Sequence, residues 1–222
     1  MNNTELEDVG FESEPGAKFR QFENLIGRIS SIDERELFSL LPVAETVKNY
    51  KMFHPTHKDS LFNHSLAVAA NINHPVGRIA GLMHDWGKVI DEVKEPNINP
   101  NPALGEEWVY KHPNHQQIGA ELACDCLLML DAPRETTQLV CKLVRVHDHW
   151  GDELLADELA SEVRGMFSDE ELEILFELQV ADLEAHDPEY AGARQLELLR
   201  SQSKIMNAAP LAPADLDKTQ EV

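Results

Sequence analysis

The sequence predicts an all-α protein, folded as a helical bundle. Apolar residues recur at helical spacing through most of the chain, and the alternation typical of half-buried strands is almost absent. The 222 residues, 42% of them hydrophobic, suit one soluble domain with a substantial core. Pro75, Pro113, Pro133 and Pro188 fall near expected helix starts, where the missing N–H costs little. We expect about seven to nine helices and fewer than about a tenth of residues in strands.

The two ends of the chain differ in composition from its middle. Residues 1–17 hold five acidic residues with Pro15 and Gly16, which is typical of a disordered acidic arm. Residues 207–222, with Ala-Pro pairs and mixed polar residues, are expected to form a disordered tail. The folded domain is then 18–206. Within it we expect helices at 18–29, 34–50, 60–73, 75–87, 113–130, 133–149, 152–161, 168–186 and 188–205.

Two features of this helix series are informative. Ser168 followed by three acidic residues is a favourable helix start, because a hydroxyl cap precedes carboxylates in the first turn. Residues 89–112 form the longest stretch without helical periodicity, and they contain three prolines and a glycine. Irregular segments of this length inside a compact domain are usually functional. We therefore expect 89–112 to be an irregular loop that covers an active site and contributes to substrate choice.

Charge and cysteine content limit the classes of function. A net charge of −21 disfavours a broad nonspecific surface for nucleic acid, but it allows a nucleotide at a metal site because the cations reverse the local field. Cys124, Cys126 and Cys141 are too few for a disulfide framework and lack the C-x-x-C spacing. We expect three reduced, buried thiols. No secretory leader or apolar run of about 18 residues is visible, so the sequence predicts a cytoplasmic protein without membrane spans.

Several histidines and aspartates lie on the faces of helices that are expected to be buried. His64 follows Leu61 by three residues and precedes Val68 by four, so it shares their helix face. Asp182 follows Leu178 by four residues in the same way. The same spacing argument applies to the whole candidate set, which consists of His64, His84, Asp85, His115, His147 and Asp182.

Buried carboxylates need a partner. An unpaired carboxylate in a protein core costs several kcal/mol, and few basic residues lie on these faces. A divalent metal centre accounts for all six residues together, because neutral imidazoles and ionised carboxylates are common ligands of such ions. The sequence predicts one or two divalent ions, drawn from Mn, Fe, Co, Ni, Zn or Mg. Ligation by His and Asp without Cys suits hydrolysis better than a closed structural site.

Three segments resemble the H…HD…D motif of the HD superfamily of metal-dependent phosphohydrolases. They are FNHSLAV at 62–68, AGLMHDWGK at 80–88 and VAD at 180–182. Two further segments, from 112 and from 143, are similar to the HD half of bacterial tRNA nucleotidyltransferases. The polymerase head of those enzymes is absent, so nucleotide addition is not expected. The stretch 54–66 is also similar to the first helix of HD domains in conjugative relaxases, although Asp59-Ser60 replaces the Gly-Gly pair of that group.

The resemblance implies an HD-domain helical bundle and assigns roles to the candidate residues. His64, His84, Asp85 and Asp182 are expected to hold a first metal ion. His115 and His147 are expected to hold a second ion, with Asp85 bridging. Lys88 is either a phosphate contact or a solvated lysine at a helix end. Asp148 and His149 are expected to orient a ligand or protonate the leaving group.

Five further histidines are not assigned to the metal centre. His57 is either a substrate contact or a surface residue. His54, His74, His112 and His186 are expected to be structural or solvated. Together with the predicted metal centre, the resemblance implies a metal-dependent hydrolase of phosphoesters, with a nucleotide or a related phosphorylated small molecule as substrate. The alternatives are a nucleic-acid-processing module of a mobile element and a non-catalytic HD scaffold.

Overall fold

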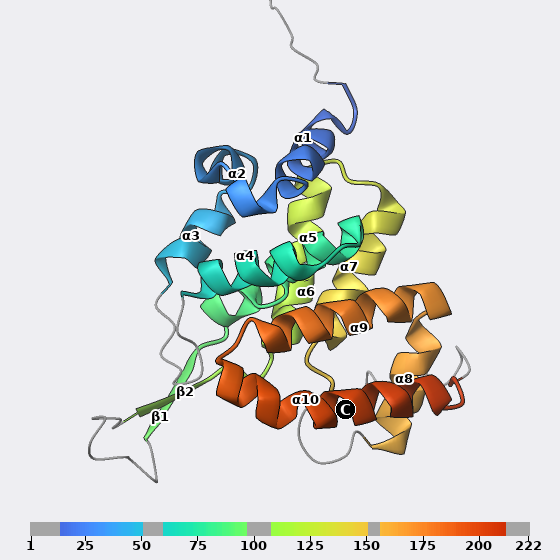
Figure 1. Cartoon of the computed structure of the whole chain (residues 1–222). Helices are drawn as coiled ribbons and strands as arrows, with labels where there is room; N and C mark the ends of the chain where they lie inside the picture. Colours follow the sequence, from blue (N-terminus) through green and yellow to red (C-terminus); the bar gives the residue numbers. More distant parts are fainter. Residues whose placement is uncertain (1–13, 51–59, 97–107, 151–155, 212–222) are drawn as a thin grey trace, which may run out of the picture.

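The computed structural model describes residues 14–50, 60–96, 108–150 and 156–211, and it confirms the all-α fold class (Figure 1). The described residues form ten α-helices, two short 3-10 helices and one pair of strands. The elements are α1 (Ala17–Ile26), η1 (Ile29–Ser31), α2 (Glu34–Leu40), α3 (Val43–Asn49), α4 (Leu61–Asn71), α5 (Pro75–Met83), η2 (Trp86–Val89), β1 (Val93–Pro96), β2 (Trp108–Lys111), α6 (His115–Met129), α7 (Arg134–Val146), α8 (Asp157–Met166), α9 (Asp169–Glu184) and α10 (Pro188–Asn207).

Helix α5 lies at the centre of the bundle. It packs against α4, α7 and α9, and α6 pairs closely with α7 as a hairpin of two helices. Five consecutive residues of α5, from Ile79 to Met83, are buried. Figure 1 shows α1 to α3 at one end of this arrangement and α8 and α10 at the other. A helix that is apolar on nearly all sides is expected at the centre of a bundle.

The expected helix bounds differ from the observed ones at one or both ends, and three of the expected helices differ most. The helix expected at 34–50 is divided into α2 and α3 at Leu41 and Pro42, where proline supplies no N–H to continue the first helix. The helix expected at 75–87 ends at Met83 and is followed by η2. Helix α8 begins at Asp157 instead of 152, and 151–155 lie outside the described residues. The prediction of seven to nine helices was therefore too low.

The helix start predicted at Ser168 is confirmed as a capping box. The backbone N–H of Glu171 donates to the Ser168 hydroxyl, and the backbone N–H of Ser168 donates to the Glu171 carboxylate. Two of the four orphan N–H groups at this helix end are thereby satisfied. Helix α9 then runs without interruption to Glu184 and carries Asp182 near its end.

The stretch 89–112 is not irregular throughout. It contains β1 and β2, which pair antiparallel with Val93 opposite Lys111 and Pro96 opposite Trp108. Lys111 and Glu95 form an ion pair of 2.6 Å across this ribbon. Residues 97–107 lie outside the described part, as do 1–13 and 212–222, so the predictions of an arm, a tail and an active-site cover are not tested there.

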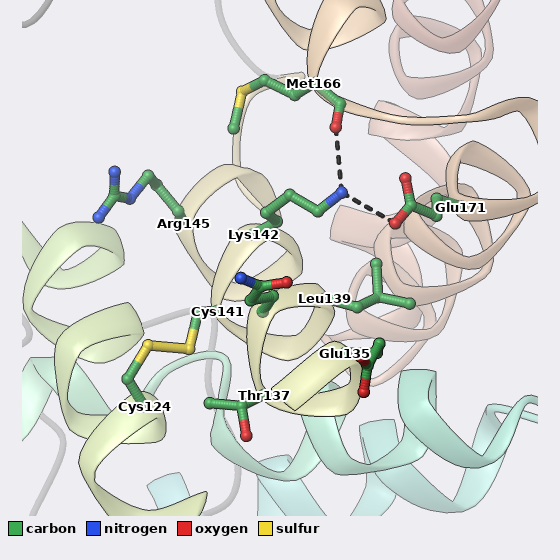
Figure 2. Close-up of a pocket in the computed structure, with 10 residues that line it drawn as sticks. Cys124, Glu135, Thr137, Leu139, Cys141, Lys142, Arg145, Met166 and Glu171 are labelled. Carbon is green, nitrogen blue, oxygen red and sulfur yellow. Dashed lines mark hydrogen bonds and ion pairs between the residues drawn. A yellow bond between two sulfur atoms is a disulfide. The ribbon is translucent and has the colours of Figure 1, made fainter. Parts of the chain in front are cut away.

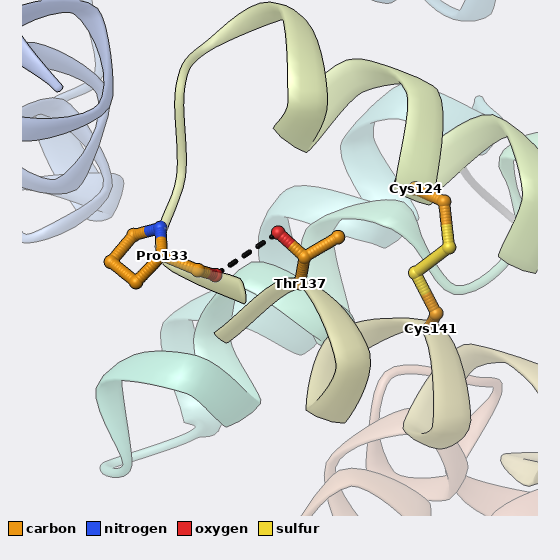
Figure 3. The surroundings of a disulfide bond; sticks show 4 residues. All are labelled: Cys124, Pro133, Thr137 and Cys141. Carbon is orange, nitrogen blue, oxygen red and sulfur yellow. Dashed lines mark hydrogen bonds between the residues drawn. A yellow bond between two sulfur atoms is a disulfide. The ribbon is translucent and has the colours of Figure 1, made fainter. Parts of the chain in front are cut away.

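The cysteines contradict the expectation of three reduced thiols. Cys124 of α6 and Cys141 of α7 form a disulfide with Cα atoms 5.8 Å apart, whereas Cys126 is a buried thiol (Figure 3). The hairpin of α6 and α7 brings the two cysteines together across a sequence separation of 17. Spacing along one helix could not show this contact between two helices. Among the described residues, no helix is long and apolar enough to cross a membrane.

Candidate metal centre

Five helices deliver six buried histidine and aspartate side chains to one place. His64 lies in the middle of α4, His84 and Asp85 follow the last residue of α5, and Asp182 lies near the end of α9. His115 is the first residue of α6 and His147 follows the last residue of α7, so the hairpin places both at the same end. All six side chains are buried, and each is one of the candidates predicted from the sequence.

Asp85 lies between two pairs of imidazoles. Its Oδ2 atom is 3.3 Å from His84 Nε2 and 3.9 Å from His64 Nε2. Its Oδ1 atom is 3.4 Å from His115 Nε2 and 3.6 Å from His147 Nε2. Each oxygen of one carboxylate therefore faces a different pair of histidines.

Asp182 also contacts the first pair of histidines, His64 and His84. Its Oδ1 atom lies 3.0 Å from His64 Nε2 and 3.4 Å from His84 Nε2. The donor atoms fall into overlapping groups that can each hold one ion, with ligand atoms within 4.8 Å of one another. One such group is His64, His84 and Asp85, and another is Asp85, His115 and His147.

Backbone carbonyl groups orient three of the histidines. The Nδ1–H groups of His84, His115 and His147 donate to the carbonyl oxygens of the residues three positions earlier, at 2.8, 2.7 and 2.7 Å. Because Nδ1 donates in these bonds, Nε2 is the ring atom that each of these histidines directs at the carboxylates. This arrangement is the usual way in which proteins fix the tautomer of a metal-binding histidine.

The electrostatics of the centre favour a bound cation. Burial acts to lower the pKa of His84, but Asp85 and Asp182 outweigh it and raise the pKa to about 10. Burial acts to raise the pKa values of both carboxyl groups, but Lys88 and His84 hold that of Asp85 well below its ordinary range. His84 and His64 do the same for Asp182. His84 Nε2 and Asp85 Oδ1 are buried without a hydrogen-bond partner. The two ionised carboxylates hold a proton on the buried His84 imidazole, and a divalent metal ion would take the place of that proton.

His115 of the second pair is less basic than His84 of the first. Burial lowers the pKa of His115 to about 4, although the Asp85 carboxylate opposes this effect. A neutral imidazole is the form that binds a metal. His115 is therefore ready to act as a ligand at any pH near neutrality, without first losing a proton.

Lys88 is not the solvated lysine that was one of the two sequence interpretations. Its side chain is only 15% exposed, and Nζ donates to Asp85 Oδ2 at 2.6 Å. Burial acts to lower the pKa of Lys88, but Asp85 raises it, so the ammonium group stays charged beside the carboxylate. Its role as a phosphate contact remains a prediction.

The other predicted side chains lie at the edge of the centre or away from it. Asp148 Oδ2 is 3.9 Å from His115 Nε2 and its side chain is 45% exposed. His149 lines a small cavity with Arg145 and residues of α8. His74 caps α5 and His112 supplies the carbonyl oxygen for His115, so both are structural as expected. His54 and His57 lie outside the described residues.

His186 is a residue of the centre that the sequence interpretation missed. Its Nδ1–H donates to the Asp182 carbonyl oxygen at 2.8 Å, and Nδ1 lies 3.8 Å from Asp182 Oδ1. Its ring centroid is 5.0 Å from that of His64, and these three residues form a further group able to hold an ion. The spacing of four residues from Asp182 on one helix face was the available signal.

Comparisons with known proteins do not identify the chain. No protein-family model matches it. No curated protein matches it either. The resemblance to the HD superfamily therefore remains a prediction from motifs, and the interpretation of the centre depends on the geometry of the residues given above.

Proposed function

We propose that this protein is a metal-dependent phosphohydrolase of the HD type, acting on phosphoesters of nucleotides or related small molecules. The observation that carries the proposal is the position of Asp85, whose two carboxylate oxygens face two separate pairs of histidines at 3.3–3.9 Å. This geometry suits a carboxylate shared by two ions. The motif resemblance of 62–68, 80–88 and 180–182 supports the same interpretation.

The ligand sets follow from the distances. His64, His84 and Asp182 with one oxygen of Asp85 would hold the first ion, and His115 and His147 with the other oxygen would hold the second. Divalent ions supply two effects in phosphoester hydrolysis: they lower the pKa of bound water toward about 7, and they neutralise charge on phosphoryl oxygens.

The remaining residues have roles that their positions allow. Lys88 keeps a positive charge beside Asp85 at the edge of the centre, where it would attract an anionic phosphate. Asp148 is half-exposed near His115, where it would orient a ligand or protonate the leaving group. The described centre contains imidazoles, carboxylates and one ammonium group, so water is the simplest nucleophile.

Metal analysis and a substrate panel test the proposal. Protein purified without a nickel column should contain one or two divalent ions per chain by inductively coupled plasma mass spectrometry. The variant Asp85→Asn should lose tight binding of both ions, whereas Asp125→Asn, on the exposed face of α6, should retain them.

Turnover is tested with nucleotide phosphoesters in oxygen-18 water. The label should appear on the released phosphate, and a chelator should abolish activity. Retention of metal by Asp85→Asn would show that the ligand assignment is wrong. Metal binding without turnover of any phosphoester would contradict hydrolysis and leave the non-catalytic scaffold.

A further inference from the structure

The Cys124–Cys141 disulfide joins the two helices that carry one pair of histidines. Cys124 follows His115 by nine residues on α6, and Cys141 precedes His147 by six residues on α7. Because α6 and α7 form a hairpin, the crosslink and the histidines lie on the same two helices, about two turns apart. No other helix of the centre is crosslinked within the described part of the chain.

The disulfide borders a pocket that small molecules can enter. A cavity of about 590 Å³ is lined by both cysteines, by apolar Leu139 and Met166, and by the cations Lys142 and Arg145 (Figure 2). Both cysteines are half-buried, so their sulfur atoms are not sealed in the core. The pocket is separate from the histidine and aspartate cluster, because none of those six residues lines it.

The two cationic side chains at this pocket differ in their hydrogen-bond partners and in their exposure. Lys142 donates to the Met166 carbonyl oxygen at 3.1 Å and to Glu171 at 2.8 Å, and it lies over the Phe167 ring. Arg145 is exposed and lies one helical turn after Cys141. A guanidinium at this spacing favours an anion near the sulfur atoms, and it stabilises a thiolate that leaves from Cys141.

We propose that Cys124–Cys141 is a reversible redox site, opened in this pocket by a small anionic dithiol such as a dithiol carboxylate, and that its state sets the affinity of the His115–His147 half of the metal centre for its ion. A thiolate of a small dithiol attacks one sulfur, the Cys124–Cys141 bond breaks, and a mixed disulfide forms. The second thiol of the reagent then displaces the protein sulfur. The dithiol supplies two electrons and two protons, so the products are two protein thiols and one oxidised reagent.

The disulfide affects the metal centre because it joins the two helices that carry His115 and His147. With the disulfide closed, α6 and α7 cannot separate, and both histidines stay within 3.6 Å of Asp85 Oδ1. With the disulfide open, only packing holds α6 against α7. The distance between His115 and His147 then varies over a wider range. His64, His84 and Asp182 lie on other helices, so the first half should be insensitive to the redox state. This metal-dependent part rests on the proposed function.

The crosslink itself is tested on metal-free protein. Alkylation under denaturing conditions should find one thiol before treatment with a dithiol and three after it. Reduction, or the variant Cys141→Ser, should speed hydrogen exchange in α6 and α7 about tenfold or more and lower Tm by about 5–10 °C. The variant Cys126→Ser keeps the disulfide and serves as the matched control. Three thiols in air-oxidised protein, or unchanged exchange after reduction, would overturn the proposal.

Titration with Mn²⁺ tests the link to the centre. In the reduced protein the second ion should bind about tenfold more weakly, whereas affinity for the first ion should stay the same. Arg145→Ala should slow reduction by the dithiol without changing Mn²⁺ affinity of the oxidised protein. Equal affinity for the second ion in both states would overturn the link. Faster exchange on reduction in a protein that binds no metal would support the redox site and contradict the proposed function.

Discussion

At the residue scale, short local contacts decide which atom of each histidine faces the centre. The Nδ1–H groups of His84, His115 and His147 bond to carbonyl oxygens of their own chain three residues earlier. For His84 and His147 the accepting carbonyl groups lie in the last turns of α5 and α7, where helical N–H partners are lacking. The His112 carbonyl group lies just before α6 and also accepts the His115 backbone N–H. The result is that each Nε2 atom is directed toward Asp85 before any ligand binds.

His186 is expected to position Asp182 through the same kind of contact. Its Nδ1–H donates to the Asp182 carbonyl oxygen, and its ring packs against His64. The variant His186→Ala should weaken binding of the first ion about tenfold, because side chains that orient ligands have effects of this size. His186→Asn, which retains an N–H donor, should restore part of the affinity. Calorimetric titration with Mn²⁺ measures both effects.

A second histidine variant distinguishes the positioning of Asp182 by His186 from an effect on the stability of the fold. His74 caps α5 by accepting a hydrogen bond from the Gly77 N–H, away from the centre. His74→Ala should lower Tm slightly and leave the affinity for Mn²⁺ unchanged. Equal affinities of wild type and His186→Ala would show that His186 has no part in the centre.

At the element scale, the close approach of η2 to α6 brings Asp85 to His115. A Cβ atom at Gly87 would lie 2.1 Å from the His115 carbonyl oxygen and 2.6 Å from the Gly119 backbone nitrogen. Both neighbours are backbone atoms, so neither can rotate away. Glycine at this position of the HD-x-GK segment therefore permits contact between two elements that carry residues of the centre.

The variant Gly87→Ala should destabilise the protein by about 3 kcal/mol, because overpacking against backbone forces η2 and α6 apart. Affinity for the second ion should fall with it. Gly192→Ala in α10 is the control: its Cβ would meet nothing within 4 Å, so helix propensity predicts a gain of about 0.5–1 kcal/mol. Chemical denaturation measures both variants, and equal stability of Gly87→Ala and wild type would contradict the packing argument.

The ion pair of Glu171 at the start of α9 makes the stability of the fold depend on pH. Burial acts to raise the pKa of Glu171, but the Lys142 ion pair and the Ser168 N–H lower it below 4.5. A carboxyl group whose folded pKa is depressed stabilises the fold above its unfolded pKa, and this stabilisation is lost as pH falls through the folded value.

The variant Glu171→Gln should therefore be less stable than wild type at neutral pH, by up to about 1 kcal/mol. The difference should disappear in acid, below the folded pKa of Glu171. Glu173→Gln, at an exposed position of the same helix, is the control and should show no such trend. A constant difference between Glu171→Gln and wild type from neutral to acidic pH would contradict the ion-pair explanation.

At the scale of the whole molecule, the centre connects five helices that are distant in sequence. The chain has 40 acidic and 19 basic residues, and two ionised carboxylates lie in its core. A divalent ion would reduce the repulsion between these two carboxylates. It would bind only the folded state, because the six side chains converge only on folding.

Added Mn²⁺ should therefore raise Tm, and a chelator should reverse the rise. At a free concentration 100 times the Kd, linkage predicts about 2.7 kcal/mol, which corresponds to a shift of roughly 5–10 °C in a chain of this size. Asp85→Asn should show no shift, and Asp125→Asn should behave as wild type. Differential scanning fluorimetry measures the series. An equal shift in Asp85→Asn would indicate that Mn²⁺ binds elsewhere.

Local periodicity in the sequence predicted the all-α class, most helix positions, and the burial of four histidines and two aspartates. Those features depend on spacing within one helix, which local periodicity records. The contact of Lys88 with Asp85, the place of His186 and the pairing of Cys124 with Cys141 come from the tertiary structure alone. The structure also places each oxygen of Asp85 beside a different pair of histidines. These depend on the separation and rotation of neighbouring helices, which are set by how side chains from several elements pack together.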